Sequence, residues 1–167
     1  HIFVFCEKEK KRLSEILEAK IHVVGSVRNN KFPITSKEIN KKIKSIIFIS
    51  QYASSMKNEP NIPFNIFKTQ KEKQIFNYLI KFCENKKIQL KFLSKAKAEH
   101  LGESFFRNFF IKGNWIFYNH VNLEKTYKII NKQQMVVFHF STLGFEALAK
   151  GIRCVSFNNY FPMKGYH

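Results

Sequence analysis

Two hydroxyl residues, a glycine and an acid lie close together in the C-terminal part of the sequence, as Ser141, Thr142, Gly144 and Glu146. The first backbone N–H groups of a helix, together with the helix dipole, bind anions, and neighbouring hydroxyls add further hydrogen-bond donors. A glycine leaves room for a phosphate to approach the backbone. An acid that caps a helix reciprocally follows the cap residue by three positions, a spacing that Glu146 does not have. We therefore interpret these residues as a phosphate site at a helix start, with Glu146 as an acceptor for ribose hydroxyls.

The same residues also fit an ordinary strand–helix–strand unit. In that interpretation Ser141 and Thr142 only cap the helix, and Glu146 is a solvated side chain. The spacing of the residues does not decide between the two interpretations.

The segments on either side predict the elements that position this group. Residues 135–140 form an apolar run rich in β-branched and aromatic side chains, which indicates a strand buried on both faces. A helix is predicted over residues 143–150, with Gly151 at its end, and a further strand over residues 153–157. The candidate group therefore follows the carboxyl end of a buried strand.

Strand and helix patterns alternate along the rest of the chain. The predicted strands are residues 2–5, 21–24, 45–50, 88–93 and 115–118. The predicted helices are residues 8–20, 71–85, 98–111 and 122–131, with a loop over residues 53–67. This alternation predicts an α/β fold, a Rossmann-like parallel sheet with helices on both faces. The aromatic side chains of residues 98–111 recur at helical spacing, and we interpret them as core.

Polar residues follow several of these strands, and parallel sheets bind ligands at the carboxyl ends of their strands. Ser50 and Gln51 end one strand, Lys95 follows the next, and His120 follows the one after that. We include these four residues in the candidate ligand site. His139 lies within a predicted strand, and we interpret it as a core histidine.

A second polar segment, with Gly25, Ser26, Arg28 and Asn29, follows the strand predicted over residues 21–24. Arg28 could hold a carboxylate or a phosphate, but we favour a surface arginine in a turn. The passage that follows contains Pro33 and predicts a connection between two domains. We divide the chain into residues 1–40, the end of an N-terminal Rossmann-like domain, and residues 41–167, an incomplete C-terminal one.

Three segments carry a resemblance to a known group of proteins. Residues 141–151, Ser-Thr-Leu-Gly-Phe-Glu-Ala-Leu-Ala-Lys-Gly, resemble the donor-site segment of GT-B glycosyltransferases. Residues 25–30, Gly-Ser-Val-Arg-Asn-Asn, and residues 49–52, Ile-Ser-Gln-Tyr, precede it in the order seen in bacterial surface-carbohydrate proteins of the O-antigen and capsule type. The likeness covers about residues 21–165.

The resemblance implies a C-terminal GT-B domain that binds a nucleotide-activated sugar. It places Ser141, Thr142, Gly144 and Glu146 at the donor, and residues 25–29 at the cleft between domains. The acceptor would be a growing glycan or a lipid-linked one. The sequence has no Asp-x-Asp pair, so we expect neither a metal nor another cofactor.

The chemistry of sugar transfer also needs a general base for the acceptor hydroxyl. GT-B enzymes usually take that base from the N-terminal domain, so none is assigned here. Two such domains need about twice this chain length, and we expect a fragment that is inactive alone. A transferase of polyol phosphate with a CDP-activated donor is an alternative on the same fold.

Charge suggests a different class of function. The chain has 29 Lys and Arg against 12 Asp and Glu, a net charge of +17, which fits nucleic acid or an anionic membrane. A basic α/β module that binds nucleic acid is therefore our second hypothesis. We favour the transferase, because the basic residues are scattered over predicted helix faces and no RNA-recognition motif is present.

Cysteines and hydropathy indicate where such a protein works. Cys6, Cys83 and Cys154 show no metal or disulfide spacing, and we expect all three to be small buried side chains in a reducing compartment. No apolar run has the roughly 18 residues of a membrane span. We expect a cytoplasmic protein that associates peripherally with the inner face of the cell membrane.

Overall fold

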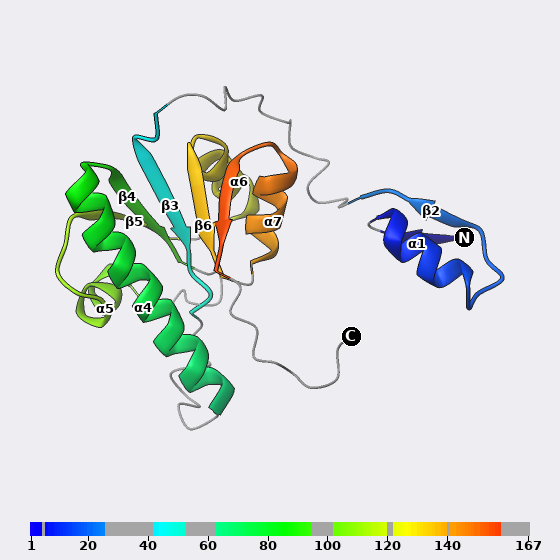
Figure 1. Ribbon diagram of the computed structural model, residues 1–167, viewed down its shortest axis with the longest axis horizontal. Helices are drawn as coiled ribbons and strands as arrows, with labels where there is room; N and C mark the ends of the chain where they lie inside the picture. The colour runs from blue at the N-terminus through cyan, green and yellow to red at the C-terminus, as the bar shows by residue number, and fades with distance from the viewer. Residues whose placement is uncertain are drawn as a thin grey trace. The chain divides into compact units, whose positions relative to one another are not determined.

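The structure is a computed structural model that describes residues 1–4, 6–25, 42–52, 63–94, 102–119, 122–139 and 141–157. Within residues 63–68 it describes the backbone alone. The chain divides into two compact units, His1–Ile34 and Thr35–His167, whose elements are labelled in Figure 1.

The smaller unit is a strand–helix–strand unit, as predicted. Strands β1 (Ile2–Val4) and β2 (Ile21–Val23) pair in parallel, and α1 (Glu7–Ser14) connects them. The helix is shorter than predicted and buries no residue, because charged side chains make up most of it. Ile16 follows it and is exposed, as is Cys6 before it, so the prediction that Cys6 is buried was wrong.

The larger unit is built on a five-stranded parallel sheet with the order β5-β4-β3-β6-β7 (Figure 1). Its strands are β3 (Ser45–Ile49), β4 (Gln89–Leu93), β5 (Trp115–Tyr118), β6 (Met135–Phe138) and β7 (Arg153–Ser156). Each lies within two residues of a predicted strand at both ends, since polar or glycine-containing segments bound the apolar runs. The α/β, Rossmann-like fold is confirmed.

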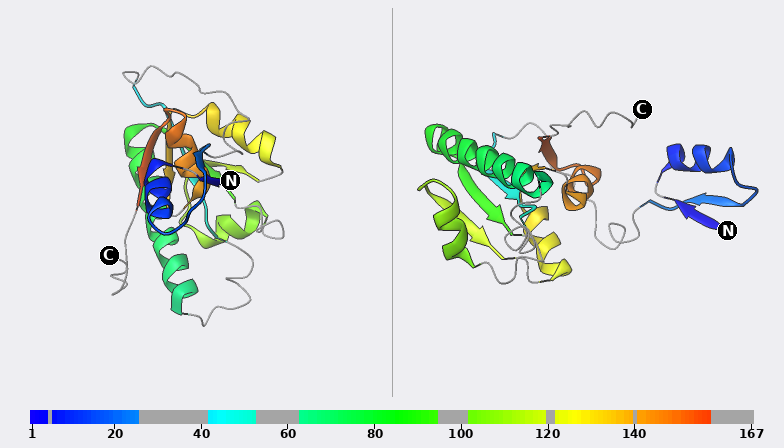
Figure 2. Two further views of the ribbon diagram at one scale, coloured as in Figure 1. Left: turned by 90° about the vertical axis from the view of Figure 1, so that its right-hand side faces the viewer. Right: turned by 90° about the horizontal axis from the view of Figure 1, so that it is seen from below.

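Helices cover both faces of this sheet, because successive side chains of a strand point to opposite faces. Ile46 and Phe48 pack under α4 (Pro63–Lys86) and α5 (Glu103–Phe109). Ile47 and Ile49 pack under the other pair of helices, α6 (Leu123–Asn131) and α7 (Thr142–Ala149). The views in Figure 2 show the two pairs of helices on either side of the sheet.

The face under α4 and α5 holds an aromatic core. Phe76 lies 4.5 Å from Phe110, and Phe92 lies 4.7 Å from Phe106, measured between ring centroids. These contacts confirm that the aromatic side chains after residue 102 are core. The loop prediction over residues 53–67 was wrong from Pro63 onward, because proline suits the first position of a helix and α4 begins there.

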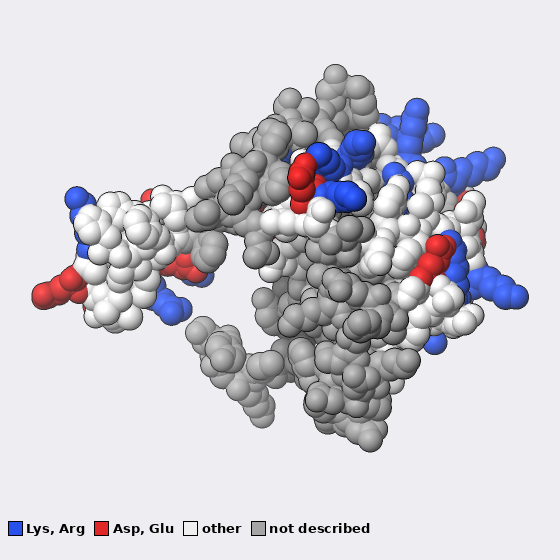
Figure 3. Space-filling view, turned by 180° about the vertical axis from the view of Figure 1, so that it is seen from behind, with Lys and Arg blue, Asp and Glu red and all other residues white. Residues whose placement is uncertain are grey.

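The surface of the larger unit is basic without a continuous basic patch on the face drawn in Figure 3. Among the described residues of that face, Lys and Arg side chains lie singly or in small groups, and acidic side chains lie beside some of them. This arrangement agrees with the prediction of scattered, solvated charge. No helix in the described part of the chain is long and apolar enough to cross a membrane.

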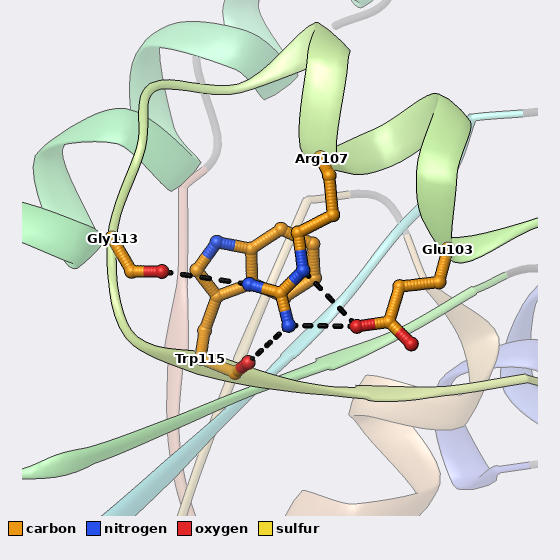
Figure 4. A network of polar contacts seen from close by, with 4 residues as sticks. All are labelled: Glu103, Arg107, Gly113 and Trp115. Carbon is orange, nitrogen blue, oxygen red and sulfur yellow. Dashed lines mark hydrogen bonds and ion pairs between the residues drawn. The ribbon is translucent and has the colours of Figure 1, made fainter.

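Arg107 joins α5 to the edge strand β5 (Figure 4). Its guanidinium carbon lies 3.8 Å from the centroid of the Trp115 ring, and Nη2 donates to the Trp115 carbonyl at 2.7 Å. The same nitrogen lies 2.7 Å from Oε1 of Glu103, to which Nε also donates at 3.0 Å. A planar group is needed to stack and donate in two directions at once.

Replacing Arg107 by lysine is expected to lower the free energy of unfolding by about 1–2 kcal/mol, because the ammonium keeps the charge but loses the stacking and the forked donation. Urea unfolding with an unchanged m-value checks this. The matched control is Lys128→Ala, which breaks the exposed pair with Glu124 and should cost about 0.5 kcal/mol or less. Equal losses for the two variants would contradict the role given to Arg107.

Candidate functional site

The strand order places a topological switch point between β3 and β6. From β3 the chain moves outward to β4 and β5, then returns through α6 to pair β6 with the other side of β3. Ile49 is in register with Phe138, so the two strands end at the same level. Open α/β sheets bind their ligands outside the carboxyl ends of the strands at such a point. Ser50 and the start of α7 flank it.

The start of α7 is capped by Ser141. Its hydroxyl oxygen accepts the backbone N–H of Gly144 at 3.3 Å, and its carbonyl accepts that of Phe145 at 3.1 Å. Ser141 is buried, whereas Thr142 is the first helical residue and its side chain is exposed. The two hydroxyls therefore differ in role: Ser141 holds the helix, and Thr142 is accessible at its start.

Gly144 lets α7 pack closely on β6. A Cβ atom at this position would lie 2.2–2.5 Å from three atoms of the Phe138 ring, closer than non-bonded carbons can come. A glycine is therefore needed at position 144 because α7 packs too closely on β6 to leave room for a side chain. From the sequence, this glycine was predicted to leave room for a phosphate, and the contact with Phe138 was not foreseen.

Glu146 is buried between α7 and α6. Only 7% of it is exposed, and its Oε2 accepts a hydrogen bond from the hydroxyl of Tyr127. Lys150, the residue directly after α7, is also buried, and its Nζ lies 5.4 Å from the centroid of the Tyr127 ring. Burial lowers the pKa of Lys150, and the negative charge of Glu146 opposes that shift. The interpretation of Glu146 as a solvated side chain is therefore wrong.

Glu72 of α4 holds the end of β3 on the other side of the switch point. The Ser50 hydroxyl donates to its Oε1, and the Gln51 backbone N–H donates to its Oε2 at 2.8 Å. Ser50 and Glu72 are fully buried, while Gln51 is half-buried. Burial and the charge of Glu72 raise the pKa of the neighbouring Tyr52.

Glu72 was not among the residues predicted from the sequence, although one feature of the sequence indicates it. Glu72 precedes Phe76 by four positions and Leu79 by seven, so it lies on the apolar face of a predicted helix. An acid on such a face needs a buried partner. The partner is Ser50, a residue that the sequence did single out.

The remaining strand-end residues are described in part. Ser94, at the end of β4, donates from its hydroxyl to Oδ1 of Asn119 at the end of β5, at 2.8 Å. His139 follows β6 and is buried, as expected of a core histidine. Gly25 follows β2 in the smaller unit with a φ of 67°. The other candidates lie outside the described residues: Ser26, Arg28, Asn29, Lys95 and His120.

Among the residues that the structure describes, no group of three or more His, Cys, Asp or Glu side chains is placed to hold a metal ion. Among the described residues, the polar groups near the switch point include backbone N–H groups, hydroxyls and two buried carboxylates.

The chain matches one family of known proteins. No curated protein matches the chain. Residues 1–163 of its 167 residues match a family described as "putative O-antigen biosynthesis protein". This match confirms the resemblance to surface-carbohydrate biosynthesis proteins that the three segments indicated. The chain therefore belongs to this O-antigen biosynthesis family.

Proposed function

We propose that this protein is a glycosyltransferase with the GT-B fold that moves a sugar from a nucleotide-activated donor to a growing O-antigen glycan or its lipid-linked precursor. The observation that carries the proposal is the start of α7 at the switch point. There the buried cap Ser141 and the exposed Thr142 begin a helix after β6, the strand that pairs with the central strand β3.

The proposed chemistry is the stabilisation of a departing nucleotide. Sugar transfer leaves negative charge on the phosphate of the donor, and preorganised N–H groups at a helix start stabilise such charge where it develops. The Thr142 hydroxyl would add one donor. This arrangement needs no metal ion. The base that deprotonates the acceptor would come from another part of the enzyme.

The ribose of the donor would lie near Glu146. A carboxylate accepts hydrogen bonds only, and ribose offers two hydroxyl donors. The resemblance of residues 141–151 to a GT-B donor segment supports this assignment, because the acid of that segment contacts the nucleotide.

The acceptor suggests where the protein works. Lipid-linked glycans are held at a membrane surface, and a net charge of +17 would draw the protein to anionic lipids. We propose a cytoplasmic enzyme that associates peripherally with the inner face of the membrane.

Replacing Thr142 by alanine is expected to weaken donor binding about tenfold, because one hydrogen bond to a charged phosphate is lost. The melting temperature should barely change, since the side chain is exposed and the cap remains. Calorimetric titration of the protein with UDP-, GDP- and CMP-activated sugars measures the affinity and identifies the nucleotide.

The matched control is Ser141→Ala, which removes the cap. It should lower the free energy of unfolding by about 1 kcal/mol. If Thr142→Ala binds the donor as tightly as the unchanged protein, the phosphate site is wrong. Tight, steeply salt-dependent binding of oligonucleotides without binding of nucleotide sugars would overturn the transferase in favour of nucleic-acid binding.

A further inference from the structure

Tyr127 and Glu146 form a buried contact between two helices on the same face of the sheet. Tyr127 lies in the middle of α6, with none of its surface exposed, and Glu146 lies in the middle of α7. The tyrosine hydroxyl donates to Oε2 of the carboxylate. The contact therefore fixes the position of Glu146, which lies about one turn after the start of α7.

Stability alone explains this contact poorly. A buried, hydrogen-bonded polar pair is often no more stabilising than an apolar pair of the same volume. What the hydroxyl adds is direction, because it determines which way the carboxylate faces. Lys150 also interacts with this pair. Its ammonium lies beside the Tyr127 ring, and the negative charge of Glu146 attracts it.

We infer that Tyr127 is a positioning residue for the ribose of the nucleotide donor, because its hydroxyl orients the carboxylate of Glu146 toward the sugar hydroxyls. The inference rests on the proposed function. A carboxylate offers about four lone-pair sites, so a bond from Tyr127 is compatible with bonds from ribose. Tyr127 itself, being fully buried, does not contact the ligand.

The test compares nucleotides with and without ribose hydroxyls. UDP, GDP and CDP are titrated calorimetrically against the full chain, and the one that binds best is compared with its 2′,3′-dideoxy form. Tyr127→Phe is expected to weaken binding of the ribose form about three- to tenfold, because one hydrogen bond to the carboxylate is lost. Binding of the dideoxy form should stay within about twofold, so the preference for ribose falls.

Two further variants sharpen the result. Glu146→Gln should reduce the ribose preference by about tenfold, because a charged acceptor becomes a neutral amide. Adding Tyr127→Phe to it should then reduce the preference little more, since both changes act on one group. Tyr78→Phe makes the same chemical change at an exposed position of α4 and should leave both affinities unchanged.

The outcomes separate the inference from the function on which it rests. Equal weakening of the ribose and dideoxy forms by Tyr127→Phe shows a purely structural tyrosine and overturns the inference, as do additive losses in the double variant. If the unchanged protein binds none of the nucleotides, the proposed function fails and the inference fails with it. Should Tyr127→Phe not fold, Glu146→Asp draws the carboxylate back from Tyr127 and must lower the ribose preference.

Discussion

Replacing Gly144 by alanine is expected to lower the free energy of unfolding by about 1–2 kcal/mol. The new Cβ would lie 2.2 Å from Cγ of Phe138, whose ring is buried in the core and has little room to rotate away. Overpacking costs roughly 1–3 kcal/mol, and a contact this short belongs at the upper end of that range. The roughly 1 kcal/mol that alanine gains over glycine within a helix offsets part of the cost. Urea unfolding measures the loss.

Two controls separate the clash from other effects of the substitution. Gly102→Ala adds a Cβ that meets nothing within 4 Å and should change stability by about 0.5 kcal/mol or less. In a Phe138→Ala background, which removes the ring, Gly144→Ala should be neutral or stabilising. If it costs as much there as in the unchanged protein, the contact with Phe138 is not the reason for the glycine.

Replacing Glu72 by alanine is expected to lower the free energy of unfolding by about 3 kcal/mol or more. The carboxylate accepts from the Ser50 hydroxyl and from the Gln51 backbone N–H. Each buried donor that loses its acceptor costs about 1–3 kcal/mol, and water reaches this site poorly because Ser50 and Glu72 are fully buried. Thermal unfolding followed by circular dichroism measures the effect.

The matched substitution is Gln74→Ala, an exposed change on the same helix that should stay within about 0.5 kcal/mol. Glu72→Gln should fall between the two, because the amide keeps one acceptor oxygen. A loss for Glu72→Ala no larger than that of Gln74→Ala would show that the end of β3 is held by other contacts.

Much of the fold could be predicted from residues that act locally. Asn122 was predicted to begin a helix, and its Oδ1 accepts the Lys125 backbone N–H at 2.9 Å. Gly151 was predicted to end one in a left-handed conformation, and its φ is 76°. The start and the end of a helix each depend on a few neighbouring residues. The same is true of a strand, whose successive side chains point to opposite faces of the sheet.

The candidate site was predicted less well, because its contacts join elements that are far apart in sequence. Glu146 could be recognised as unusual for its spacing, but its partner Tyr127 lies 19 residues earlier on another helix. Which of two adjacent hydroxyls caps α7 depends on backbone angles, and Ser141 has the extended φ of −112° and ψ of 121° that a cap requires. A local sequence pattern does not predict how one helix is rotated relative to the next, and that rotation decides which side chains meet.

The switch point also implies an order of assembly for the site. On one side, Ser50 meets Glu72 only 22 residues later, a contact within the first strand–helix pair of the larger unit. On the other, the start of β3 meets β6 through Gln134, which accepts the backbone N–H groups of Lys44 and Ser45 at separations of 90 and 89 residues. Closing a long loop costs more chain entropy than closing a short one, so pairings that are distant in sequence form late in folding. We therefore expect a folding nucleus around β3, α4 and β4, with the start of α7 reaching its place only when β6 docks against the other side of β3.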